Sequence, residues 1–502
     1  MNMKKFIAVT LSAFMCLGFL FACNNEQSDN GLQTTNTADS VTGEDISTEP
    51  EETGPVLPDL PEDSYFDGYT FTVLTPYRTA TDWIQPTPRE IVHNPEEEAG
   101  VPINDAVYLR NTVLSEKFGF ELAIDARANA EEVLRRAIYA GEDTYDAAML
   151  LNAHVGGAIQ EGLFVEANNL PYVDLSKPWW DSGVEAMAIL ERQFVLGGDL
   201  LILDNEATQG LLFNKRILQD LGLAFPYDLV LEGKWTFSAF HELAKLGAHD
   251  LDGDGTMTGY ADQWGFMGFN DSLHTFLVAG GGSKAEKDRD GIPVMTFMEQ
   301  RNVNIMHRAM DFLYDRSFAM NLQSEADRGS RWGDSPHWGF QQGRGMFFWV
   351  RMVVVGRLRA MEESFGILPI PKFDENQEQY RTLVSPFTGV LLGVPITSPD
   401  LERTSIILEA ISAESGGLQR AYYDIVLQRQ LARDHESEAM LDILFSTRIY
   451  DIGAFYNFGE INWAFNDMAA NHSRAVMTVY EERSDIMREE INRLTEIIKD
   501  LN

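Results

Sequence analysis

The chain has 502 residues and a formal net charge of −38, because 77 acidic side chains outnumber 39 basic ones. This length is sufficient for a large hydrophobic core and two or three domains. The strong negative charge argues against a protein that binds nucleic acid or an anionic membrane surface.

The first 22 residues have the features of a secretory signal peptide. Lys4 and Lys5 form a basic start, and the apolar run over residues 6–21 is too short for a comfortable permanent membrane span. The run ends in Ala22-Cys23, and a small residue followed by cysteine resembles the lipobox of bacterial lipoproteins. This resemblance implies cleavage before Cys23, lipid on its sulfur, and anchoring at the extracytoplasmic face of the bacterial cell membrane. The alternative is an uncleaved anchor helix, which would leave the protein on the same side.

Residues 23–64 are predicted to form a disordered acidic tether. From Asn24 onward the segment has no lysine or arginine and few large apolar residues, so it cannot bury enough surface to offset its chain entropy. Cys16 would be removed with the signal and Cys23 would carry lipid. The mature chain would therefore have no disulfide and would depend on its core for stability.

The first part of the folded chain alternates between strand and helix patterns. Alternating apolar residues predict strands at 69–73 and 120–124, and a mostly apolar run predicts a third strand at 145–151. Helices are predicted at 104–118 and 129–140, each ended by a glycine. This order predicts a parallel, doubly wound sheet, in which ligands bind in loops at the carboxyl ends of the strands.

The stretch that follows predicts a connection between two domains. An apolar run at 200–203 is a candidate buried strand. A second apolar run at 211–213 leads into a short helix at 216–221, which Gly222 ends.

Two later segments carry the most specific pattern. Phe340, Gly343 and Met346 have the spacing F-x-x-G-x-x-M, and residues 365–372 have the sequence F-G-I-L-P-I-P-K. Further expected features are a hairpin tip at 288–291, a helix at 303–314, a strand at 390–394, a helix that begins at Ser398, and a long helix at 476–501.

Together with Gly162-Leu163-Phe164, these segments resemble the extracellular solute-binding proteins of the sugar-type family 1, the ligand receptors of ABC importers. The family usually has Gly-Lys-x-Ala-Met where this chain has Gly343-Arg344-Gly345-Met346, a mild departure. The resemblance implies an α/β, two-lobed, periplasmic-binding-protein-like (type II) fold with a hinge and an interlobe ligand cleft. It assigns residues 65–203 and 366–410 to lobe 1, and residues 204–365 and 411–502, with the C-terminal helices, to lobe 2.

The resemblance also implies a carbohydrate ligand, held by aromatic stacking and by polar side chains. Candidate residues come from the loops after the first and third strands, from the connection, and from the second lobe. They are Tyr77, Arg78, Trp83, Asn152, His154, Asp204, Glu206, Thr208, Trp264, Trp338, Trp349 and Arg351. The alternative for each of them is a core or plain surface position.

The segment 250–262 has the spacing of a calcium-binding loop, with Gly255 at the turn position. Position 12 of the loop is Ala261 instead of glutamate, so an acidic residue one place later would have to serve. Either the loop binds a structural Ca²⁺, or it is a solvated acidic turn. The ligands would be Asp250, Asp252, Asp254, the carbonyl of Thr256, and Asp262.

Catalytic sequence motifs are missing from this chain. It has no G-x-S-x-G, G-x-G-x-x-G or G-x-x-x-x-G-K-[ST] segment, and His241-Glu242 has no second histidine at metal-hydrolase spacing. The prediction is a monomeric, non-enzymatic lipoprotein that needs no cofactor, captures a carbohydrate, expected to be an oligosaccharide, and delivers it to the permease subunits of an ABC transporter. Two alternatives stay open: a secreted glycoside hydrolase-like enzyme, whose paired carboxylates sequence spacing does not exclude, and a structural surface lipoprotein with a degenerate cleft.

Overall fold

The computed structural model of the chain describes residues 56–77, 89–97, 100–259, 261–324, 337–426 and 436–501. Contacts divide the chain into Met1–Pro55 and one compact unit, Val56–Asn502. The predicted signal peptide, Cys23 and most of the predicted tether lie outside the described residues. Within the described part, no helix combines the length and the apolar character that a membrane crossing requires.

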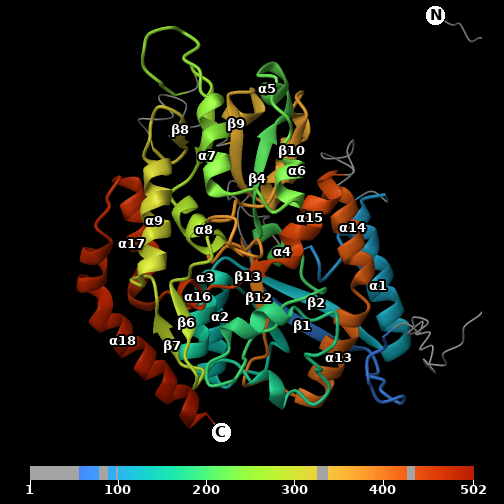
Figure 1. Cartoon of the computed structure of the whole chain (residues 1–502). Coiled ribbons are helices and arrows are strands. Elements are labelled where there is room, and N and C mark those ends of the chain that lie inside the picture. Colours follow the sequence, from blue (N-terminus) through green and yellow to red (C-terminus); the bar gives the residue numbers. More distant parts are fainter. Residues whose placement is uncertain are drawn as a thin grey trace, which may run out of the picture. The chain divides into compact units, whose positions relative to one another are not determined.

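The first sheet is built from four strands, β1 (Tyr69–Pro76), β2 (Phe120–Arg127), β3 (Ala147–Leu151) and β12 (Val390–Gly393). Their order is β12-β3-β1-β2, and β12, β1 and β2 are labelled in Figure 1. β1 pairs in parallel with β2 and β3, whereas β12 runs antiparallel to β3. The parallel pairing predicted from the strand–helix alternation is confirmed for β1, β2 and β3, and β12 confirms the strand predicted at 390–394 but makes the sheet mixed.

Helices cover both faces of the first sheet. They are α1 (Pro102–Phe118), α2 (Ala130–Ala140), α3 (Asn152–Gln160) and α13 (Leu401–Ala413). Met149 of β3 belongs to the core cluster that contains Ile407 of α13, whereas its neighbour Leu150 belongs to the cluster that contains Leu134 of α2. Because successive strand residues face opposite sides, a strand buried on both faces is apolar throughout.

The second sheet contains β4 (Gln209–Asn214), β5 (Trp264–Gly268), β8 (Ala319–Asn321), β9 (Gly345–Arg351) and β10 (Phe365–Leu368). Their order is β10-β4-β9-β5-β8, antiparallel from β10 to β9 and parallel from β9 to β8. Its helices are α5 (Lys215–Asp220), α6 (Tyr227–Leu231), α7 (Phe237–Leu246), α8 (Ser272–Ala279), α9 (Gln300–Leu313), α11 (Trp338–Gln341) and α12 (Met352–Val355). The apolar run 211–213 lies within β4, and the helices predicted at 216–221 and 303–314 are confirmed.

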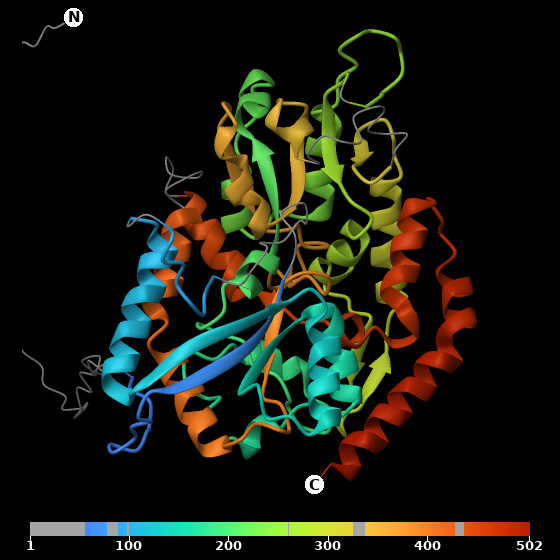
Figure 2. The same ribbon diagram turned by 180° about the vertical axis from the view of Figure 1, so that it is seen from behind.

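The C-terminal part is mainly helical, with α14 (Gly416–Val426), α15 (Glu436–Ser446), α16 (Ile452–Tyr456), α17 (Ile461–Ala470) and α18 (Val476–Asp500). α14 packs on α1, whereas α15 packs on β10 and α6. α17 contacts α8 and α18 contacts α3, and both helices lie along one side of the unit (Figure 2). Two small pairings complete the described strands: β6 (Ala285–Lys287) with β7 (Pro293–Met295), which confirms the predicted hairpin, and β11 (Thr382–Leu383) with β13 (Arg448–Ile449).

Three local predictions are wrong. The run 200–203 is not a strand: it is buried, but it forms a turn that leads into a short helix, α4 (Leu203–Ala207), which lies between the two sheets (Figure 1). The segment after β3 is not a loop, because α3 begins directly at Asn152. The helix expected to begin at Ser398 begins at Leu401, where the Asp400 side chain accepts a hydrogen bond from the backbone N–H of Arg403.

Candidate functional site

Helix α4 connects segments that belong to both sheets. The carbonyl of Thr208, directly after α4, accepts a hydrogen bond from the backbone N–H of Met352 at 2.9 Å, at the end of β9. The carbonyl of Ala207 accepts one from the backbone N–H of Ser385 at 3.0 Å, on the segment that returns to β12. We call α4 together with residues 350–357 and 383–389 the junction.

Glu206 places a buried carboxylate in the junction. Its side chain is nearly inaccessible, and Oε1 accepts a hydrogen bond from Arg89 at 2.7 Å. Burial raises the pKa of Glu206, and the charges of Arg89 and Arg357 partly offset this effect. Oε2 has no hydrogen-bond partner among the described residues. A buried carboxylate oxygen of this kind is a strong acceptor for a ligand hydroxyl.

Asp204, two residues earlier, interacts with a different arginine. Its carboxylate lies 3.5 Å from the guanidinium of Arg448, which also pairs with Asp181 at 2.8 Å. Asp204 is 1% exposed, and burial raises its pKa to about 7. The two carboxylates predicted at the connection therefore both lie in the junction, but in separate ion pairs.

Three other predicted residues have structural contacts. Asn152 is buried, and its Nδ2 donates to the carbonyls of Ser385 and Thr388 at 3.0 and 2.8 Å, so it fixes the return segment to α3. His154 is not in a loop: it lies on α3, 3.0 Å from Glu131. The hydroxyl of Thr208 is buried and donates to the carbonyl of Asp204.

Two of the predicted tryptophans are core residues, which corrects their assignment to the cleft surface. Trp264 in β5 is fully buried, and its Nε1 donates to the carbonyl of Gly259 at 2.6 Å. Trp349 in β9 is buried as well, and its Nε1 donates to the hydroxyl of Thr275 at 3.0 Å. Both faces of β5 and β9 are covered, so a side chain in either strand is buried whichever face it points to.

The remaining predicted residues are at or near a surface. Arg351 is partly exposed at the end of β9, with its guanidinium 5.8 Å from the ring centre of Trp349. Trp338 in α11 is half-buried, and Tyr77, directly after β1, is exposed. Arg78 and Trp83 lie outside the described residues.

An aromatic surface that the sequence analysis did not identify lies next to the junction. Trp463 on α17 is 54% exposed, and its ring centre is 5.6 Å from that of Phe387. Phe387 in turn contacts the ring of His274 on α8 at 5.7 Å. The backbone N–H of Phe387 donates to the hydroxyl of Ser385, the residue that is bonded to α4.

The sequence does hold a signal for Trp463. In α17 the buried positions include Ile461, Phe465 and Met468, which define the inner face of an amphipathic helix. Trp463 falls on the opposite face, together with Asn466 and Asp467. The amphipathic pattern therefore predicts that this tryptophan lies outside the core.

The acidic loop brings three of its predicted calcium ligands together. One carboxylate oxygen from each of Asp250, Asp252 and Asp254 lies within 4.8 Å of the others, and all three residues are exposed. Asp262 does not join them, because its buried carboxylate accepts the backbone N–H groups of Leu251 at 2.9 Å and of residue 258 at 2.7 Å. Its role in the fold is to close the loop, which corrects its assignment as a metal ligand.

No known protein-family model matches the chain, and no curated protein matches its sequence. Many solved structures match its fold. One is the ABC substrate-binding protein Lmo0181 from Listeria monocytogenes in complex with cycloalternan, with a TM-score of 0.52 and 13% identity, over 86% of this chain and 100% of the other. Another is a cyclo/maltodextrin-binding protein complexed with maltotetraose (TM-score 0.53, 14% identity, 88% and 100% covered). A third is UspC from M. tuberculosis (TM-score 0.54, 14% identity, 84% and 100% covered).

These similarities establish the fold. The chain has the mixed α/β architecture of two-lobed solute-binding proteins, and the fold predicted from the sequence is confirmed. At this level of identity, the ligand has to be argued from the residues of this chain.

Proposed function

We propose that this protein captures a carbohydrate outside the cytoplasm and delivers it to the permease of an ABC importer. The fold supports this proposal, because two of the similar structures are a substrate-binding protein with cycloalternan and a maltodextrin-binding protein with maltotetraose. Both are binding proteins, which favours capture of a sugar over its hydrolysis. The proposal includes a lipid anchor on Cys23, a monomeric state, and docking of the ligand-bound form on the permease.

The observation that carries the proposal is that the junction holds both an aromatic ring and a buried carboxylate, Phe387 and Glu206. An exposed tryptophan, Trp463, packs on Phe387, and the buried carboxylate of Glu206 offers an oxygen without a partner among the described residues. A sugar has an apolar face that stacks on aromatic rings and hydroxyls that donate to carboxylates. Because α4 is bonded to segments from both sheets, a ligand held here can favour one arrangement of the two sheets over another.

The test is a thermal-shift screen with mono- and oligosaccharides. The protein is the chain from residue 23 onward with Cys23→Ser, so that no lipid is attached. A saccharide at a hundred times its dissociation constant is expected to stabilise the fold by about 2.7 kcal/mol. Chromatography of the mixture is expected to show the saccharide unchanged.

The variant Trp463→Ala tests whether the saccharide that raises the thermal midpoint binds at the junction. The loss of a stacking ring is expected to weaken binding by about 1–2 kcal/mol, roughly five- to thirtyfold, and to change the midpoint without ligand only slightly. Met477→Ala on α18 is the matched control, because Met477 is 55% exposed and Trp463 is 54% exposed. Silence across the whole panel would rule out a carbohydrate ligand, and release of a cleaved product would show that the protein is an enzyme.

A further inference from the structure

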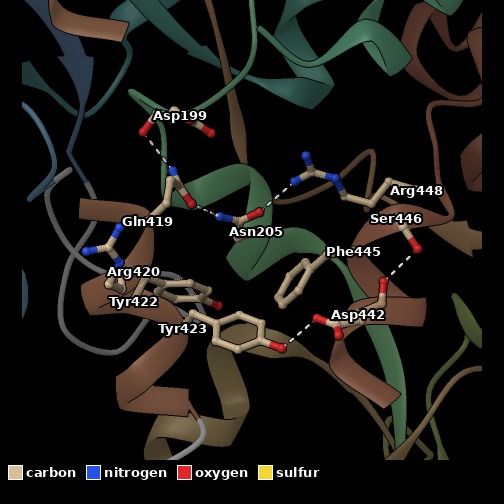
Figure 3. A pocket seen from close by; sticks show the side chains of 10 residues that line it. All are labelled: Asp199, Asn205, Gln419, Arg420, Tyr422, Tyr423, Asp442, Phe445, Ser446 and Arg448. Carbon is tan, nitrogen blue, oxygen red and sulfur yellow. Dashed lines mark hydrogen bonds between the residues drawn. The ribbon is translucent and has the colours of Figure 1, made fainter. Parts of the chain in front are cut away.

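A separate cavity lies between α14, α15 and α4 (Figure 3). Its volume is about 640 Å³, within the range of roughly 300–1,000 Å³ that is usual for small-molecule sites. α14 packs on α1 and α15 packs on β10, so the walls of this cavity come from helices that rest on different sheets. None of the aromatic residues of the proposed junction site lines it.

One wall of the cavity is aromatic. The ring of Phe445 on α15 lies 6.5 Å from that of Tyr422 and 6.4 Å from that of Tyr423, both on α14. Figure 3 shows the two tyrosine rings side by side, with Phe445 across from them. The ring of Phe445 and the two tyrosine rings that it contacts offer an apolar surface on which the C–H face of a cyclic ligand can pack.

The opposite wall is a hydrogen-bonded chain of polar side chains. Arg448 donates to Oδ1 of Asn205 at 2.6 Å, and Asn205 donates to Oε1 of Gln419 at 2.7 Å. Gln419 in turn donates to the carbonyls of Asp199 and Leu201, both at 2.7 Å. These bonds hold the wall in place before any ligand arrives, which lowers the entropy cost of binding.

Three polar groups at the cavity are left to bind a ligand. Tyr422 is 4% exposed, and its buried hydroxyl has no hydrogen-bond partner in the described part of the chain. The half-buried carboxylate of Asp199 accepts no side-chain hydrogen bond from a described residue, and burial raises its pKa to about 6. The exposed guanidinium of Arg420 forms no ion pair with any residue in the described ranges. Together they supply an acceptor, a donor, and a group that can do either.

The formal charges of the lining residues sum to zero, with Arg420 and Arg448 against Asp199 and Asp442, and Asp181 and Asp204 pair with Arg448 behind the lining. This surrounding has no excess of positive charge to attract an anionic ligand, whereas a neutral ligand with several hydroxyls can use both donors and acceptors.

We propose that this cavity is a second ligand site, which binds a neutral cyclic polyol such as a single sugar ring. It adjoins the junction, because Asn205 of α4 lines it, but it is separate from the aromatic surface of Trp463 and Phe387. Because its walls rest on different sheets, its ligand stabilises the arrangement in which they face each other.

Titration calorimetry of the chain from residue 23 onward, with Cys23→Ser, tests this inference with glucose, maltose and mannotriose as probes. The expected result is two binding events per chain for at least one probe. Tyr422→Phe removes only the unpartnered oxygen, so the midpoint of the ligand-free variant is expected to be unchanged or slightly higher. Its affinity at the second site is expected to fall at least fivefold, and Asp199→Asn is expected to have a similar effect on binding.

Tyr456→Phe is the matched control, since Tyr456 is an equally buried tyrosine whose hydroxyl donates to the carbonyl of Met187 at 3.0 Å. It is expected to lower the midpoint and to leave both affinities unchanged. One binding event that Trp463→Ala weakens and Tyr422→Phe leaves intact overturns the second site and retains the junction site. One event with the reverse pattern supports the cavity and overturns the junction as the carbohydrate site. No binding of any probe overturns both.

Discussion

Arg448 is the counter-ion of two buried carboxylates at and near α4. Its guanidinium pairs with Asp181 and Asp204, whose side chains are 10% and 2% exposed, and it donates to Asn205. Removing one partner of a buried ion pair leaves an uncompensated charge in a region of low dielectric constant. The carboxylates of Asp181 and Asp204 would then be left without their counter-ion.

We therefore expect Arg448→Met to lower the free energy of unfolding by about 3–5 kcal/mol at pH 8. The loss is expected to be smaller at pH 5, because Asp204, whose pKa is raised to about 7, is then protonated. Urea denaturation at both pH values measures it. Arg488→Met removes the exposed pair with Asp485 and is expected to cost less than about 1 kcal/mol. Equal small losses for both variants would contradict this account.

Glu90 gives the fold a pH dependence. Its side chain is fully buried, and burial raises its pKa from 4.5 to about 7. Between these two values the folded state holds a proton that the unfolded chain releases, so the stability falls as the pH rises. Below pH 4.5 Glu90 does not reduce the free energy of unfolding, and above pH 7 the reduction has reached its full size.

Glu90→Gln keeps the oxygen that accepts the Ile202 N–H and removes the titration. Titration of Glu90 lowers the free energy of unfolding by up to about 1.4 kcal/mol for each pH unit between its two pKa values. The variant is expected to lack this contribution, so its stability should fall less steeply between pH 4.5 and 7.5. Urea denaturation at several pH values tests this, with the exposed Glu121→Gln as the control. Parallel curves for Glu90→Gln and the unsubstituted chain would show that Glu90 does not titrate in this range.

At the scale of elements, the loop between α7 and β5 combines an acidic turn with a buried closing residue. Asp250 accepts the backbone N–H groups of Gly253 and Gly255, both at 2.7 Å, and these bonds lower the pKa of Asp250. Three carboxylates within 4.8 Å of one another repel each other at neutral pH, and a divalent cation relieves this repulsion. We propose that Ca²⁺ binds here as a structural ion.

Addition of Ca²⁺ well above its dissociation constant is expected to stabilise the chain by on the order of 2–3 kcal/mol, and EGTA is expected to reverse the shift. Asp252→Asn is expected to reduce the effect sharply. Asp290→Asn, in the exposed turn between β6 and β7, is the control. A thermal midpoint that does not respond to Ca²⁺ would identify the segment as a solvated acidic turn.

The elements also show why some predictions from sequence hold and others do not. The helix that ends at Phe118 is followed by Gly119 at φ 67°, where an added Cβ would lie 2.5 Å from the ring of Tyr65, so the glycine signal was reliable. The run 200–203 is as apolar as a buried strand, yet it forms a turn and the start of α4. Burial alone makes such a run apolar, and four residues are too few for periodicity to separate strand from turn.

At the scale of the whole molecule, the ligand is expected to act on the relation between the two sheets. The segments at 350–357 and 383–389 meet α4 from different sheets, and Trp463 reaches the same region from α17. A ligand that contacts segments from both sheets can favour a closed arrangement of the sheets over an open one. The free energy of this preference equals the difference between its binding free energies for the closed and open arrangements.

Small-angle X-ray scattering with and without a bound saccharide tests this expectation. The radius of gyration is expected to decrease at saturation, and Trp463→Ala is expected to shift the decrease to about five- to thirtyfold higher ligand concentration. Met477→Ala is again the control. An unchanged radius at full occupancy would mean that the ligand binds without closure.

The sequence by itself determined the strand–helix alternation of residues 69–151, the parallel pairing of the first strands, the glycine helix ends, and the acidic residues of the connection. These features depend on local periodicity and turn chemistry, which a chain carries wherever it is placed. Only the tertiary structure decided which aromatic side chains reach a surface: Trp264 and Trp349 are buried between covered faces, whereas Trp463 is exposed beside Phe387, more than seventy positions away. It also decided that Asp204 and Glu206 pair with different arginines, and that α14 and α15 enclose a cavity. Burial and ion pairing depend on contacts between distant segments, and sequence spacing does not specify those contacts.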